Sequence, residues 1–178
     1  ATGIRTAMAN KDNISGLLPD NCLNIIKNHT TIEYNDFSTV LGSKLLSMDT
    51  LDHIEGINQD LSNRIANNKY NFTDIETFIP MLQSKNYTYS AISRALLHII
   101  LDIKTDDIKE FVNNNYAMIL GFTKKSGVLS EISKSTKIPL VSKFATFYKE
   151  ADNNQRKMLD INLKADNLYR MIYMNKTG

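Results

Sequence analysis

The sequence contains a single cysteine, Cys22, among its 178 residues. One cysteine excludes a disulfide within the chain and a zinc site built from several thiolates. We expect Cys22 to be a small, buried apolar residue on a helix rather than a nucleophile. The three histidines are isolated from one another, with no HxH or HxxxH spacing. A metal site is therefore not expected.

Long apolar runs are also missing. No run approaches the roughly 18 to 20 residues of a membrane-spanning helix, and no basic segment followed by an apolar one opens the chain. We therefore expect a cytoplasmic protein without membrane contact. The GxSxG, Walker A and dinucleotide-binding glycine patterns are absent as well. Carboxylates stand singly in expected turns and caps, so no pair stands out for acid–base catalysis.

What the sequence does have is an ordinary globular composition with an uneven distribution of charge. Hydrophobic residues make up 42% and charged residues 22% of the chain, and the net charge is only +2. Residues 33–76 are rich in acids, whereas residues 124–149 contain six lysines and one acid (Lys124, Lys125, Lys134, Lys137, Lys143 and Lys149 against Glu131). A lysine-rich segment of this kind attracts phosphate groups. An ordinary solvated surface is the alternative.

The apolar periodicity is mostly helical. It predicts five helices, near residues 21–29, 37–48, 57–68, 75–85 and 91–103, and a last helix from about residue 154. The runs "YAMILGF" and "IPLVSKF" predict short strands on either side of a helix over "VLSEISKS". We therefore predict a mainly α fold, a helical bundle-like domain with a small βαβ-like insert near residues 116–143.

The stretch "QSKNYTYSAISRALLHII" combines a cation, aromatic rings and hydroxyls in one loop and helix. Lys85, Tyr87 and Arg94 could together hold a phosphate and stack on a base. The alternative is that the tyrosines pack the loop while Arg94 pairs with an acid of residues 33–76. We expect His98, on a helix that is apolar nearly all round, to be a satisfied core residue.

The opening "ATGIRTAM" places small residues, a hydroxyl and an arginine at the start of an expected helix. Backbone N–H groups, Thr2 and Arg5 would there be aimed at one point, which suits a triphosphate. The alternative is a frayed N-terminal helix. The first half of a phosphate-binding corner is missing before Ala1, so we expect the start of this sequence to be a cut.

Five segments in order resemble the C-terminal portion of the tRNA(Met) cytidine acetate ligase family, once described as predicted nucleotidyltransferases. They are "ATGIR…ISGLLP", "DHIEGINQDLSNRI", "SKNYTYSAISRALLHIIL", "YAMILGFTKKSGVLSEISKSTKIPLVSK" and "LDINLKADNLYRMI". The resemblance covers nearly the whole chain, and several motifs in order are more specific than any one of them.

The resemblance implies an enzyme that activates acetate with ATP, accompanied by Mg²⁺, as acetyl-adenylate and acetylates the wobble cytidine of elongator tRNA(Met). Members of the family have an N-terminal nucleotidyltransferase domain with an HxGH signature, which is absent from this sequence. We therefore expect residues 1–10 to be a remnant of that domain and residues 11–178 to be a helical tRNA-binding region, inactive and without a cofactor by itself. The expected partners are tRNA, rather than DNA, and the missing N-terminal domain.

The resemblance also assigns residues. "ATGIR" is similar to the family's Ser-Ala-Thr-x-Ile-Arg motif, so Thr2 and Arg5 are expected to contact the ATP phosphates. The family's Lys-Arg-Tyr-Thr is Lys85-Asn86-Tyr87-Thr88 here, and Ala91 and "AMILGF" stand where arginines are usual. Together with the lysine-rich segment, the expected RNA-binding set is Lys85, Tyr87, Arg94, Lys124, Lys125, Lys134, Lys137 and Lys143.

Two other functions fit the sequence. One is a non-catalytic helical module that binds RNA or protein. The other is an anticodon-binding appendix of an aminoacyl-tRNA synthetase, which would need a longer partner domain with a second signature.

Overall fold

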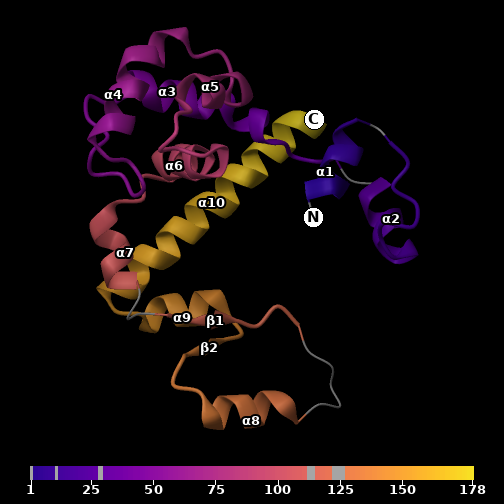
Figure 1. The fold of residues 1–178 in the computed structure, drawn as a ribbon. Helices are drawn as coiled ribbons and strands as arrows, with labels where there is room; N and C mark the ends of the chain where they lie inside the picture. The colour runs from indigo at the N-terminus through magenta and orange to yellow at the C-terminus, as the bar shows by residue number, and fades with distance from the viewer. Residues whose placement is uncertain (1, 11, 28–29, 112–114, 122–126) are drawn as a thin grey trace.

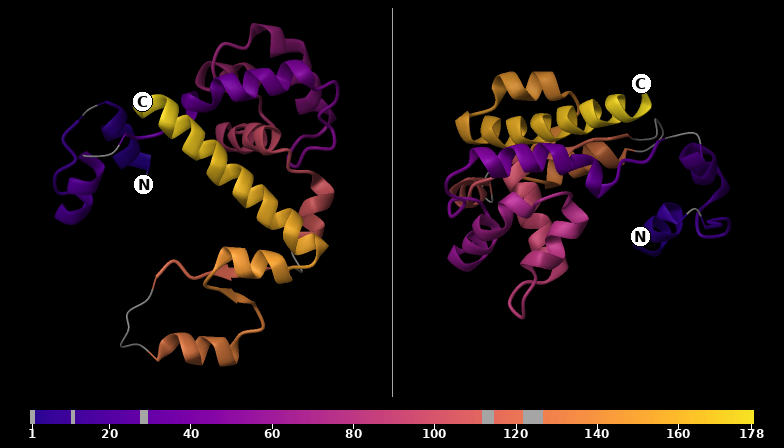
Figure 2. Two further views of the ribbon diagram at one scale, coloured as in Figure 1. Left: turned by 180° about the vertical axis from the view of Figure 1, so that it is seen from behind. Right: turned by 90° about the horizontal axis from the view of Figure 1, so that it is seen from above.

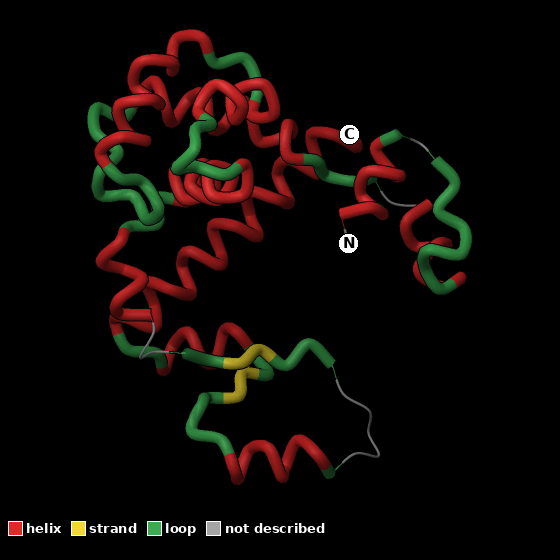
Figure 3. The backbone as a smooth tube through the Cα atoms, in the orientation of Figure 1, coloured by secondary structure: helices red, strands yellow, loops and turns green. Residues whose placement is uncertain are grey.

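A computed structural model describes residues 2–10, 12–27, 30–111, 115–121 and 127–178 (Figures 1 and 3). Most of these residues are helical. The elements in chain order are α1 (Thr2–Ala9), α2 (Asp20–Lys27), the 3₁₀ helix η1 (Tyr34–Phe37), α3 (Ser38–Ser47), α4 (Gln59–Asn68), the 3₁₀ helix η2 (Lys69–Asn71), α5 (Ile75–Leu82), α6 (Tyr89–Leu101), α7 (Thr105–Phe111), β1 (Ala117–Met118), α8 (Val128–Ser135), β2 (Leu140–Val141), α9 (Phe144–Glu150) and α10 (Asn153–Thr177).

Helices α3 to α6 surround the main hydrophobic core. Each presents a stripe of residues that is almost fully buried, with α6 supplying Ile92, Leu96 and Ile99. Helices α4, α5 and α6 begin where a side chain satisfies a free N–H group of the first turn. Asn58 Oδ1 accepts from the N–H of Leu61 at 3.0 Å at the start of α4, and Thr88 does the same for α6. Periodicity and caps thus agree in this part of the chain.

Helix α10 crosses the molecule obliquely and is held by polar contacts along its length (Figure 1). Lys157 Nζ lies 3.2 Å from Glu110 Oε2 on α7, and Lys164 Nζ donates to the carbonyl of Leu101 at the end of α6 at 2.7 Å. Near its C-terminus, Lys176 Nζ lies 2.7 Å from Asp36 Oδ2 in η1. Within the described residues no helix is both long and apolar enough to cross a membrane.

The two ends of the molecule lie away from this core (Figures 1 and 2). At one end, α1 and α2 stand apart. At the other, β1 pairs in parallel with β2, Ala117 opposite Leu140 and Met118 opposite Val141, and α8 connects them without a buried residue.

The predicted class, a mainly α, helical bundle-like domain with a βαβ-like insert near residues 116–143, is therefore wrong. A bundle needs helices aligned around one core, whereas here α3 to α6 surround the core, η1 and Leu168 of α10 pack against it, and α8 and α2 are remote from it. Cys22 on α2 is likewise only partly buried, because this end of the chain packs so little.

The contact between Asp36 and Lys176 should make the free energy of unfolding depend on pH. Partial burial by itself raises the pKa of Asp36, but the hydrogen bond and charge of Lys176 and the N–H of Glu33 outweigh it and hold the pKa below the ordinary 3.8. A carboxyl group whose pKa is lower in the folded than in the unfolded state stabilises the fold at pH values above its unfolded-state pKa. This contribution is lost as the pH falls through its folded-state pKa. Asp36→Asn and Lys176→Met should each flatten the loss of unfolding free energy between about pH 5 and pH 2.

Urea unfolding followed by circular dichroism over this pH range measures the effect. Asp49→Asn, which changes an exposed aspartate outside this contact, is the control. If Asp36→Asn loses stability with acid as steeply as the parent, the pair does not hold α10 to η1.

Candidate functional site

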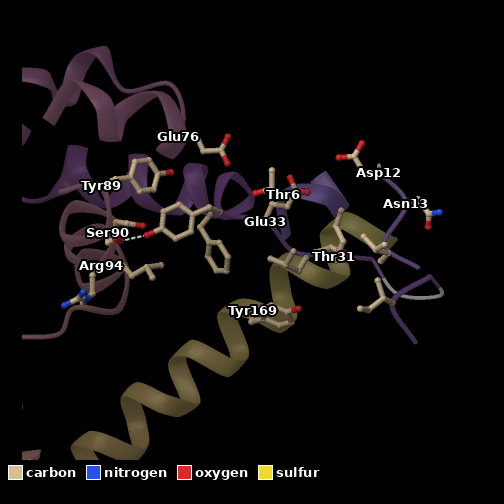
Figure 4. A pocket seen from close by; sticks show the side chains of 18 of the residues that line it. Thr6, Asp12, Asn13, Thr31, Glu33, Glu76, Tyr89, Ser90, Arg94 and Tyr169 are labelled. Atoms are coloured by element: carbon tan, nitrogen blue, oxygen red, sulfur yellow. Dashed lines mark hydrogen bonds between the residues drawn. The ribbon is translucent and has the colours of Figure 1, made fainter. Parts of the chain in front are cut away.

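A cavity of about 1470 Å³ separates the α1–α2 end from the core (Figure 4). Residues 31–37, the N-terminal half of α6 and Tyr169 of α10 form its other walls. Four aromatic side chains line it, together with hydroxyls and a single cation among the described side chains: Tyr34, Phe37, Tyr89, Tyr169, Ser90, Ser93 and Arg94. Such a mixture of aromatic surface and a few polar groups is typical of ligand sites.

Tyr34 is a fixed part of the wall. Its hydroxyl donates to the backbone carbonyl of Ser93 on α6. Burial is the main cause that raises the pKa of Tyr34 above its ordinary value, and nearby Tyr89 adds to it, while the hydrogen bond to Ser93 works the other way. Tyr34 therefore stays neutral and ties residues 31–37 to α6.

Arg94 is exposed on the face of α6 that lines the cavity. The ion pairs among the described residues do not include it, so the alternative that it pairs with an acid of residues 33–76 is not found there. His98, one turn further on, places Nδ1 2.8 Å from the carbonyl oxygen of Glu55. His98 thus has the internal partner that was expected for it, and Arg94 remains available to a ligand.

The other two residues expected to bind RNA, Lys85 and Tyr87, lie in the loop before α6 but have different surroundings. Tyr87 packs against the core, and its hydroxyl donates to Asn58 Oδ1, the side chain that caps α4. Lys85 is exposed beside it. The structure therefore gives Tyr87 an internal role and leaves Lys85 on the surface.

The lysine-rich segment does not lie beside this cavity. Lys134 on α8, Lys137 and Lys143 are exposed, but α8 lies at the opposite end of the molecule from α5 and α6 (Figure 1). Lys124 and Lys125 lie outside the described residues. One continuous basic surface joining Lys134 to Arg94 is thus not what the fold provides.

Thr2 and Arg5 lie in α1, but their side chains are outside the part of the chain that the structure describes. Helix α1 itself reaches the cavity through Thr6 and Met8. The opening motif and Arg94, nearly ninety residues apart, therefore belong to elements that border one cavity.

Three acids also line the cavity (Figure 4): Asp12 follows α1, Glu33 precedes η1, and Glu76 lies on α5 beside Tyr89. Glu76 is partly engaged, because Asn35 Nδ2 donates to its Oε2 at 3.2 Å. Among the described residues, no three His, Cys, Asp or Glu side chains come together as a metal site would require.

Tyr169 and the serines of α6 were not among the residues singled out from the sequence. Ser90 stands four residues before Arg94 and Ser93 four residues before Leu97, so each serine shares a helix face with the later residue. The helical period could have found these serines once Arg94 was chosen. Tyr169 comes from α10, 75 residues after Arg94, and no local pattern connects the two.

The comparisons with known proteins point to one family. The model of the HIGH Nucleotidyl Transferase family matches residues 1–178. The tRNA(Met) cytidine acetate ligase of Thermoanaerobacter sp. (strain X514) is 30% identical over 152 residues, which cover 85% of this chain and 37% of that protein. The ligase of the same name from Caldanaerobacter subterraneus subsp. tengcongensis is 30% identical over 183 residues, covering 98% of this chain and 45% of the relative.

The chain belongs to the HIGH nucleotidyl transferase family. It spans less than half the length of these two curated relatives. The crystal structure of Thermotoga maritima TmcAL bound with alpha-thio ATP has the same fold, with a TM-score of 0.83 and 22% identity, over 97% of this chain and 46% of the other. This likeness also contradicts the predicted mainly α, helical bundle-like class, because the shared fold is that of TmcAL and not of a purely helical bundle.

The family match also corrects the expected extent of the resemblance. The prediction of a C-terminal portion only is wrong, since the HIGH nucleotidyl transferase model matches from residue 1 through residue 178. The expectation that the nucleotidyltransferase domain is a missing partner of this chain finds no support in that match.

Tyr87→Phe separates the internal role of this tyrosine from a role in binding RNA. Removing the hydroxyl leaves Asn58 with only the N–H of Leu61, so the unfolding free energy should fall by roughly 0.5–1.5 kcal/mol. The affinity for tRNA should stay within about twofold of the parent. Chemical denaturation and filter binding measure the two quantities, and a loss of affinity at unchanged stability would instead place Tyr87 in an RNA site.

Proposed function

We propose that this chain acts in an ATP-dependent acetate ligase reaction, with the cytidine of tRNA(Met) as the acetyl acceptor. The observation that carries the proposal is the 30% identity, along 98% of the chain, to a protein named for that reaction. In this reaction acetate displaces pyrophosphate from ATP to give acetyl-adenylate. The amino group of cytidine then takes the acetyl group, loses a proton and releases AMP. A tRNA substrate places the activity in the cytoplasm.

The α1 side of the cavity would take the ATP. The Thermotoga relative is described as bound with alpha-thio ATP, and Thr2 and Arg5 of α1 are our candidates for phosphate contacts. A helix start favours anions through its free N–H groups. Asp12 and Glu33 line the same cavity and would oppose a triphosphate, so Mg²⁺ carried by the phosphates would offset their charge there.

The tRNA would be bound by exposed cations at two separate places. Lys85 lies in the loop before α6 and Arg94 in the N-terminal half of that helix, whereas Lys134, Lys137 and Lys143 lie around α8 and β2. Among the described residues, no hydrogen-bond partner holds these cations in a fixed orientation toward a base edge. They would therefore contact phosphates and orient the RNA rather than read its sequence. Lys124 and Lys125, which lie outside the described residues, stay candidates from the sequence alone.

We expect this chain by itself not to activate acetate. Its 178 residues contain no HxGH and no glycine-rich phosphate loop, and without such groups the reacting atoms of ATP and acetate are not held in line. Acetate-dependent exchange of labelled pyrophosphate into ATP should stay at background. The Thermoanaerobacter ligase is the positive control, and exchange by the purified chain would show that its own residues suffice.

Binding of tRNA(Met) should depend strongly on salt. Each phosphate that is neutralised contributes roughly 0.7–0.9 to the slope of log affinity against log salt. Changing Lys134 and Lys137 together to Ala should lower this slope by about one to two units if both contact phosphates. Because both lysines are exposed, the thermal midpoint should hardly change.

Lys69→Ala with Lys109→Ala is the matched control, since it removes two cations from η2 and α7 outside the proposed places. Salt-independent binding, or a double variant of α8 that binds like the parent, would assign the lysine-rich segment to the solvated surface. A third outcome is that the chain binds tRNA but leaves the acetylation rate of a complete ligase unchanged when it is added to that enzyme. This result would favour the non-catalytic binding module.

A further inference from the structure

An apolar slot of about 290 Å³ lies between α6 and α10, next to the large cavity. Leu97, Ile100 and Leu101 of α6 form one wall and Leu168 and Tyr169 of α10 the other. The slot and the cavity share Phe37, Leu97 and Tyr169, so the two spaces adjoin at these residues. Its volume is at the low end, roughly 300 Å³, of sites that hold whole small molecules, which suits a single ring system.

Tyr169 stands where the two spaces meet and is 50% exposed. Within the described residues its hydroxyl has no hydrogen-bond partner and its ring no aromatic partner. Tyr34, on the opposite wall, is tied to Ser93. A half-exposed ring with a free hydroxyl offers both a stacking surface and a polar group for a flat, polar-edged ring.

The wall of α6 beside this ring changes character from one turn to the next. Ser90, Arg94 and Leu97 stand at spacings of four and three residues and therefore share one face, and all three line the cavity. Along this face, the hydroxyl of Ser90 and the cation of Arg94 are thus followed by Leu97, which also lines the apolar slot. Figure 4 shows Arg94 on α6 and Tyr169 on α10, both on the side of the cavity away from Asp12.

We infer that the slot between α6 and α10 holds an unstacked nucleobase of the RNA substrate against Tyr169, while Arg94 binds a neighbouring phosphate of the same strand. This inference rests on the proposed function and names the part of the cavity that receives RNA. Aromatic stacking with an arginine nearby is the usual way in which proteins hold single-stranded bases. RNA is favoured over the adenine of ATP because α1, the candidate phosphate site, lies on the side of the cavity where Asp12 stands, away from Arg94 of α6.

The test uses the absence of tryptophan from the chain. Tyr169→Trp keeps a stacking ring and introduces a unique fluorophore at the entrance of the slot. Emission should be quenched on addition of tRNA(Met) transcript or of an oligocytidine hexamer, and should not change on addition of ATP with Mg²⁺. Quenching by ATP and not by RNA would overturn the inference in favour of the adenine.

Affinity measurements on the whole chain supply the second arm. Tyr169→Ala should weaken binding of both RNAs by about fivefold or more, as expected for loss of one stacked base, while Tyr169→Phe should stay within about twofold of the parent. Arg94→Ala should reduce the salt slope for the hexamer by about one unit or less. Tyr70→Ala removes a tyrosine that is 80% exposed on η2, outside the cavity, and should bind like the parent.

The outcomes separate the two proposals. Binding of tRNA that is unchanged by Tyr169→Ala overturns the base-holding slot and leaves the proposed function standing. Absence of tRNA binding by the parent, with unfolding curves showing a folded chain, overturns both.

Discussion

The burial of one face of α6 is the constraint on which the rest of this structure depends. Ile92, Leu96 and Ile99 are fully buried against the helices of the core, and this fixes the rotation of α6 about its axis. The opposite positions, among them Ser90 and Arg94, must then face outward into the cavity. Loss of a buried side chain of this size costs about 2–5 kcal/mol, so the orientation of Arg94 is secured by residues that never contact a ligand.

The segment from Tyr34 to Asp36 connects α6 to α5 and to the C-terminal helix α10. Tyr34 donates to the Ser93 carbonyl on α6. Asn35 Oδ1 accepts from the N–H of Glu76 at 3.0 Å at the start of α5. Asp36 accepts a hydrogen bond from Lys176 of α10. Three consecutive residues thus join three helices. The geometry of the cavity between α6, η1 and α10 therefore depends on these polar contacts as well as on the apolar packing of α10, where Leu159 is buried and Leu168 packs against the core.

The sequence was informative where structure is determined locally. Periodicity located α3 to α6. It also placed Arg94 and His98 one turn apart on one helix, where His98 has its expected internal partner and no ion pair of Arg94 occurs among the described residues. The sequence was uninformative where contacts are distant. Tyr87 looked like a ligand-binding ring because nothing local reveals that Asn58, 29 residues earlier, accepts its hydrogen bond. Helices α7 and α9 are seven residues long, too short for a clear period, and the docking of Lys164 on Leu101 spans 63 residues.

The separation of the two cationic regions limits what kind of RNA could use both. Lys134, on α8, and Arg94, on α6, lie at opposite ends of the molecule (Figure 1), and the Debye length at physiological salt is only about 8 Å. Their fields therefore do not merge into one attractive surface, and each must contact its own phosphates. A single nucleotide or a short strand could occupy only one of the two regions. A folded RNA with two helical arms could reach both, so any preference of this chain for tRNA over short strands would come from α8, while the side of α6 and α10 would treat the two alike.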